Sequence, residues 1–100
     1  MPDNLPAMPL AMCARAHDLA YVLMEARTIL EQTGEAMERL KGWESRAAKA
    51  IYGEARVHAE GIARHAENWL QSRQLSPGKT ANEAADLWRA LGEHSYRCEP

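Results

Sequence analysis

Two regularly spaced lines of apolar and small residues constrain the fold of this chain more than any other feature. In the first half, residues recur at alternating steps of four and three: Leu19, Leu23, Ala26, Leu30, Thr33, Met37 and Leu40. In the second half, the same spacing links Ala48, Tyr52, Ala55, Ala59, Ile62, Ala66 and Trp69. This spacing places each set on one face of an α-helix, as in helices that share a seam. The sequence therefore predicts two long helices that pack against each other.

Proline and glycine set the expected ends of these helices. Three prolines within residues 1–9 predict an extended arm, because proline removes a backbone donor and restrains the residue before it. The first helix is therefore expected to begin near Leu10. Its seam keeps phase through Gly34, which favours one continuous helix; a break there is the alternative, since an interior glycine costs about 1 kcal/mol relative to alanine. Lys41-Gly42-Trp43 is the expected turn, and the second helix is expected over about 43–74.

A short third helix is predicted near the C-terminus. The residues before it, 76–78, read Ser-Pro-Gly and mark a loop. Thr80 and Glu83 have the spacing of a capping box, in which each side chain accepts a hydrogen bond from the other residue's backbone N–H. The helix that follows places Ala84, Trp88 and Leu91 on one face and ends at Gly92.

Together these elements predict an all-α fold, a long antiparallel helical hairpin with a short third helix packed against it. The chain divides into a proline-rich arm (1–9), a single helical domain (10–92) and a C-terminal tail (93–100). A helix of about 30 residues is about 45 Å long, and the third helix is too short to cover it. Part of the seam should therefore stay exposed, or the chain should dimerise, or the long helices should break into shorter ones.

Composition limits the functions that such a chain can have. Of the 100 residues, 18 are alanine and none is phenylalanine, so the predicted core is small. The net charge of −2 favours neither a basic nucleic-acid-binding protein nor an acidic mimic of DNA. Arginine outnumbers lysine nine to three, which, with the alanine content, indicates GC-rich coding in a bacterium or its phage.

The hydropathy pattern and the N-terminal residues predict a cytoplasmic protein of a bacterial host cell. No apolar run approaches the ~20 residues of a membrane span, and the N-terminus lacks the pattern of a secretion signal. Cys13 and Cys98, the two cysteines, are therefore expected to be free thiols, because disulfides are rare in reducing compartments.

The sequence predicts no catalytic, cofactor or metal site. Glu54, His58 and His65 share a helix face, but the two histidines are seven residues apart, too far for one helix to bring both within bonding distance of an ion. Cys13 and His17 have the spacing of a nucleophile and its base, but nothing nearby would orient the histidine. We therefore expect no enzyme and no small-molecule substrate.

Candidate partner-binding residues lie mostly on the polar stripe opposite the second seam, where a solvated face is the simpler interpretation. They are Arg46, Lys49, Arg56 and Arg64, with Trp43 at the predicted turn and Tyr96 in the tail. Tryptophan, tyrosine and arginine are the residues that dominate binding hot spots in protein interfaces. Glutamates interrupt the stripe, which disfavours direct nucleic-acid binding.

In its length of 100 residues, its alanine- and arginine-rich composition and its lack of motifs, the chain resembles the small all-helical phage anti-CRISPR proteins. That resemblance implies a non-enzymatic inhibitor that binds an RNA-guided CRISPR surveillance complex and blocks DNA binding or nuclease recruitment. The partner would then be a protein or a ribonucleoprotein, and the chain a monomer or a homodimer. The alternative is a self-associating structural or accessory protein of a phage particle or a toxin–antitoxin pair. A small nucleic-acid-binding regulator ranks third.

Overall fold

Three helices form the described part of the chain: α1 (Leu10–Arg39), α2 (Arg46–Ser72) and α3 (Ala81–His94). The computed structural model describes residues 5–39, 46–94 and 98, and only the backbone of 46–49. The described residues contain no strand, so the predicted all-α class is confirmed. α1 continues through Gly34, so the alternative of a break at that residue is wrong. The predicted turn at 41–43 lies outside the described residues.

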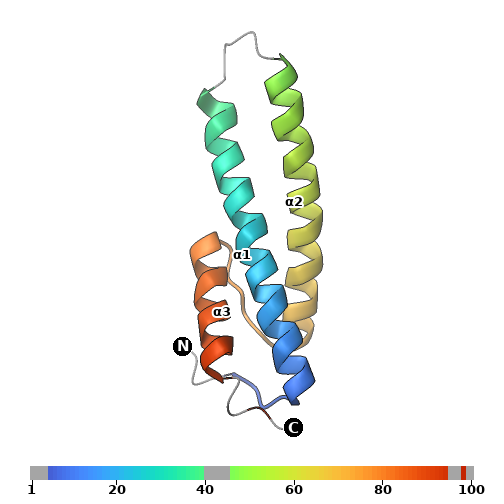
Figure 1. Ribbon diagram of the computed structural model, residues 1–100, viewed down its shortest axis with the longest axis vertical. Coiled ribbons are helices and arrows are strands. Elements are labelled where there is room, and N and C mark those ends of the chain that lie inside the picture. The colour runs from blue at the N-terminus through green and yellow to red at the C-terminus, as the bar shows by residue number, and fades with distance from the viewer. Residues whose placement is uncertain (1–4, 40–45, 95–97, 99–100) are drawn as a thin grey trace.

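α1 is the central helix of the bundle. It packs against both α2 and α3, whereas the backbones of α2 and α3 do not approach each other in the described residues. Figure 1 shows α2 and α3 on opposite sides of α1, with α3 alongside only its N-terminal part. The molecule measures 55 × 20 × 17 Å, so α1 and α2 extend well beyond the region that α3 covers.

Because α1 has two neighbours, it buries more than the one seam that the sequence predicts. A second line at steps of three and four joins Cys13, Ala16, Ala20, Leu23 and Arg27, all of which are buried. Leu19, Leu30 and Met37, which belong to the predicted seam, are only half-buried. The second line was missed because it ends on an arginine, which rarely lies in a core unless paired.

α2 buries Ala59 and Ala66 of the predicted seam, but Ala63 and Leu70 take the places predicted for Ile62 and Trp69. The buried residues are Ala59, Ala63, Ala66 and Leu70, whereas Ile62 is 49% exposed. The prediction that Ile62 lies in the seam is wrong. Alanine at the contact lets the backbones approach closely, and the larger isoleucine lies at the side of that contact.

The C-terminus of α2 ends in a left-handed residue. The Leu75 N–H donates to the Leu70 carbonyl and the Gln74 N–H to the Gln71 carbonyl, both at 3.0 Å. This pair of bonds is the Schellman arrangement, which requires a positive φ at the residue after the helix. Here that residue is Gln74, with a φ of 65°, although glycine is the residue that reaches this conformation at least cost.

Replacing Gln74 with glycine is therefore expected to stabilise the protein by about 1 kcal/mol, since a side chain in this conformation costs roughly 1–2 kcal/mol and glycine's greater entropy in the unfolded chain offsets part of that. Urea unfolding followed by circular dichroism measures the change. The matched control is Gln71→Gly, which places glycine at an exposed helical position and should destabilise by a similar amount. Equal effects of the two substitutions would contradict the argument.

The predicted capping box at the start of α3 is confirmed. The Glu83 N–H donates to Thr80 Oγ1 at 3.1 Å, and Glu83 Oε1 accepts from the backbone N–H groups of Lys79 and Thr80 at 3.1 and 3.2 Å. The hydrogen bonds from Lys79 and then Thr80 lower the pKa of Glu83. Because that pKa is lowered, the cap contributes stability at neutral pH and loses it as the pH falls through the range where Glu83 takes up a proton.

The side chain of Arg27, in α1, binds the loop that precedes α3. Its guanidinium donates to the carbonyls of Pro77 and Gly78, each at 2.7 Å, and of Thr80 at 3.0 Å, and it pairs with Glu67 Oε2 of α2 at 2.7 Å. The residue is only 4% exposed. One buried side chain thus joins α1, α2 and the loop that leads into α3.

At the other end of α3, a disulfide joins Cys13 of α1 to Cys98. The expectation of two free thiols is therefore wrong. The two residues are 85 positions apart, so no local pattern could pair them; the chain brings them together because α3 returns along α1 to its N-terminus. Met8 and part of Leu5, from the predicted arm, also pack against this end of the core.

Candidate functional site

A groove with an almost wholly apolar lining lies between α1 and α2. It encloses about 380 Å³. Both helices contribute to its walls, which are lined by Tyr21, Val22, Glu25, Ala26, Ile29, Ala55, His58, Ala59 and Ile62. We call this feature the α1–α2 groove. It lies on a part of α1 and α2 where the two helices run side by side (Figure 1).

The groove exists because small and large residues alternate across the contact between the helices. Ala26 and Ala59 are buried at its floor, while Val22, Ile29 and Ile62 stand at its sides and are 37–49% exposed. Single exposed apolar residues are normal on a protein surface, whereas these three share one groove with a polar rim, an arrangement that marks interaction sites when the apolar patch is large.

Charge is sparse along the groove and differs between its two sides. Glu25 is the ionisable residue that α1 contributes, and His58 is the one that α2 contributes. Ile51, one turn before Ala55 on the same face of α2, is 66% exposed and extends the apolar wall beyond the groove. The α1–α2 groove therefore presents a concave apolar surface with one acidic and one basic side chain at its rim.

The arginines predicted to bind a partner do not form one free surface. Arg56 is half-buried and turned toward α1, where its Nη1 donates to the Leu30 carbonyl at 2.6 Å and contacts Thr33 Oγ1 at 3.3 Å. The interpretation of its whole stripe as solvated is therefore wrong, and Glu67, on the same stripe, binds Arg27. Arg64 is exposed.

The side chains of the other four predicted contacts are not among those that the structure describes. The side chains of Arg46 and Lys49 lie outside the described atoms, and Trp43 and Tyr96 lie outside the described residues. Their role in binding stays a prediction. Sequence reasoning missed the groove itself, although the spacing of Ile51, Ala55 and Ile62 on one face of α2 carries its signal.

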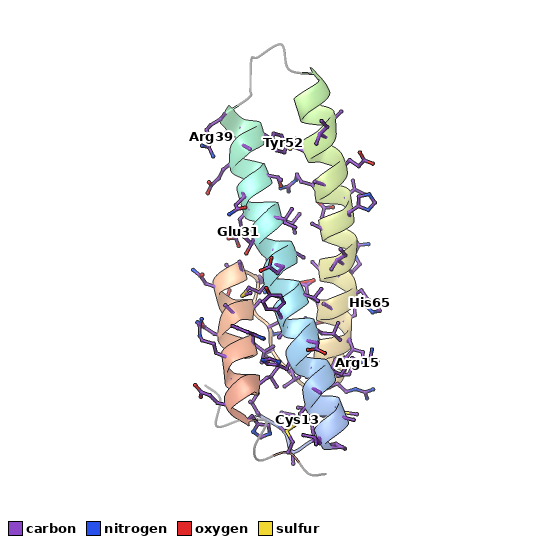
Figure 2. All side chains as sticks on the ribbon, in the orientation of Figure 1. Cys13, Arg15, Glu31, Arg39, Tyr52 and His65 are labelled. Carbon is purple, nitrogen blue, oxygen red and sulfur yellow. A yellow bond between two sulfur atoms is a disulfide. The ribbon has the colours of Figure 1, made fainter. Side chains whose placement is uncertain are left out.

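The histidines considered for metal binding or catalysis have other surroundings. His65 is exposed and points away from α1 at the outer edge of α2 (Figure 2). His17 stacks on Trp88, with ring centroids 5.5 Å apart. The sulfur of Cys13 is bonded to Cys98, so it is not a thiol that His17 could activate in this state.

None of the helices in the described residues is long and apolar enough to cross a lipid bilayer. No family model, curated protein or solved structure matches the chain.

Proposed function

We propose that this protein is a non-catalytic interaction module that docks through the α1–α2 groove, and that the groove is occupied by the same groove of a second copy. The observation that carries this proposal is the contiguous apolar surface formed by Val22, Ile29 and Ile62, each more than one-third exposed. The pair α1–α2 would then act as an antiparallel hairpin, and two hairpins would form a four-helix bundle.

The surface area of the chain supports self-association. A compact monomer of 11.2 kDa is expected to expose about 5,700 Å², whereas this chain exposes 6855 Å². The excess is roughly 1,150 Å² and reflects an elongated shape that leaves long helix faces uncovered. The radius of gyration of 16.2 Å likewise exceeds the ~13 Å of a compact 100-residue domain. A dimer would bury surface that a single copy leaves in water.

The charges at the rim favour one of the two symmetric arrangements. A twofold axis parallel to the helices places α1 against the partner's α2, so Glu25 lies near the partner's His58. A twofold axis across the helices places α1 against the partner's α1, so two copies of Glu25 approach each other. A carboxylate can accept a hydrogen bond from an imidazole N–H across an interface, whereas two like charges placed together oppose association. We therefore propose the first arrangement, in which neighbouring helices run antiparallel.

Replacing Ile29 with lysine is expected to return the dimer to monomer. The substitution buries two ammonium groups in the symmetric interface, and the loss of a central contact costs about 2 kcal/mol per copy, which together weakens association roughly 1,000-fold. Light scattering after size exclusion measures the mass at a series of concentrations. Within one chain, lysine at 29 can pair with Glu25 at the favourable four-residue spacing, so the helix content should not fall.

Val57→Lys is the matched control, because Val57 is 68% exposed on α2 but does not line the groove. It should remain dimeric. A wild-type chain that stays monomeric at all concentrations would rule out the second copy as the occupant.

The inhibitor function that the resemblance predicts is tested with the same variants. If the groove binds another protein, a tagged chain should capture an RNA-guided complex from host lysate, and Ile29→Lys should abolish the capture while Val57→Lys preserves it. Equal capture by both variants would place the binding surface elsewhere.

A further inference from the structure

Three side chains capable of binding a metal ion meet where α1 begins and α3 ends. They are Cys13 in the first turn of α1, His94 in the last turn of α3 and Cys98 after it, and their ligand atoms all lie within 4.8 Å of one another. Figure 2 shows Cys13 at this end of the molecule. Cys13 is 2% exposed, and His94 and Cys98 are half-buried, so the cluster is largely shielded from water.

His94 supplies an independent sign that the cluster binds something. Its Nε2 atom is buried and has no hydrogen-bond partner, and it is the one buried side-chain nitrogen or oxygen in the described residues with this property. A buried polar atom without a partner costs roughly 1–3 kcal/mol, so such atoms in native proteins call for an explanation such as an ion. A ring nitrogen of His94 is among the ligand atoms that lie within 4.8 Å of one another in the cluster.

We propose that the reduced form of this protein binds a zinc ion through the thiolates of Cys13 and Cys98 and the Nε2 atom of His94. Zinc prefers tetrahedral sets of cysteine sulfur and histidine nitrogen, with bonds of about 2.0–2.3 Å. Tetrahedral bonds of that length hold two ligand atoms roughly 3.3–3.8 Å apart, which lies within the span of the cluster. Three protein ligands leave the fourth position to water.

His17 is not part of the proposed set. It lies one turn along α1 from Cys13, but its ring stacks on Trp88 at 5.5 Å, and its nitrogens do not join the cluster. Cys98 lies beyond the end of α3, so it is not held within either of the helices that the cluster joins. The disulfide and the zinc site are two alternative links between the start of α1 and the end of α3.

The disulfide form and the zinc-bound form interconvert in a balanced reaction when a low-molecular-weight thiol is the reductant. Two such thiols supply two electrons and two protons to the disulfide, which yields the thiols of Cys13 and Cys98 and one small-molecule disulfide. Zinc then displaces both thiol protons to solvent, while neutral His94 donates its nitrogen lone pair. In the reverse direction, a small-molecule disulfide re-forms the Cys13–Cys98 bond, two protons are taken from solvent, and the zinc ion is released.

The test compares zinc binding by the oxidised and the reduced full-length chain. The protein is reduced with a phosphine, which is then removed without oxygen, and zinc is titrated against a coloured chelator. We expect one ion per reduced chain and none per oxidised chain. Cobalt added in place of zinc should give the visible bands of a tetrahedral site and the near-ultraviolet band of thiolate-to-metal charge transfer.

His94→Gln is the variant that separates this site from simple thiol binding. Loss of groups that merely support a ligand costs 10–100-fold in affinity, so loss of the ligand itself should weaken binding by at least about 100-fold. His65→Gln, on exposed α2 surface, should bind zinc like the wild type. The disulfide allows the folding of His94→Gln to be checked in the oxidised form. Wild-type affinity in His94→Gln, or no thiolate band in the reduced wild type, would overturn the proposal.

Discussion

Replacing Arg27 with methionine is expected to lower the free energy of unfolding by about 3–5 kcal/mol, the usual cost of removing one member of a buried ion pair. Methionine keeps the length and apolar stem of the side chain, so the decrease in the free energy of unfolding measures the contribution of the guanidinium. Without it, the carbonyls of Pro77, Gly78 and Thr80 lose their donor, and unsatisfied groups of this kind cost roughly 1–3 kcal/mol each when buried. Urea unfolding followed by tryptophan fluorescence measures the loss.

Two further arginine variants give this experiment its controls. Arg27→Lys keeps the positive charge but has three donors instead of five and cannot form the planar fork, so we expect an intermediate loss. Arg89→Met removes an arginine that is paired with Asp86 on the exposed face of α3, and exposed pairs contribute at most about 1 kcal/mol. Comparable losses in Arg27→Met and Arg89→Met would contradict the role assigned to Arg27.

Reducing the disulfide is expected to destabilise the metal-free protein by about 4–5 kcal/mol. The Cys13–Cys98 bond closes a loop across a separation of 85 residues, and in the chain-entropy model a loop of that length corresponds to about 4.6 kcal/mol. Unfolding in urea with and without a phosphine reductant measures the difference. A chelator is present in both samples, so that zinc cannot replace the lost bond.

The double variant Cys13→Ala/Cys98→Ala is the control for the disulfide experiment. It should match the reduced wild type in stability, and the reductant should not change it. If the reduced wild type were as stable as the oxidised protein, the bond would contribute nothing to the fold. If zinc restored stability to the reduced wild type but not to the double variant, the disulfide and metal experiments would support each other.

Local signals in the sequence predicted most of the fold. The helix of 30 residues through Gly34 follows from a seam that keeps its phase, and the capping box of Thr80 and Glu83 follows from residue type and spacing alone. These features depend on contacts within one or two helical turns, which a single sequence displays directly.

Features that depend on a third element were not predicted. Arg27 is buried because α1 has neighbours on two sides, and the sequence predicted a third helix without indicating which face of the hairpin it covers. The line from Cys13 through Ala20 to Arg27 was available as a second apolar face. The disulfide and the cluster with His94 depend on the return of α3 to the start of α1, which no pattern within either helix reveals.

α3 and the loop before it are linked to α1 at both ends. Around α3, motion of α1 is opposed by Arg27 at one end and by the Cys13–Cys98 bond at the other. Arg56 of α2 adds a further link to α1 at Leu30 and Thr33. The residues of α1 that line the groove, Tyr21 to Ile29, therefore lie between these links, so this wall of the groove is already formed before anything binds there.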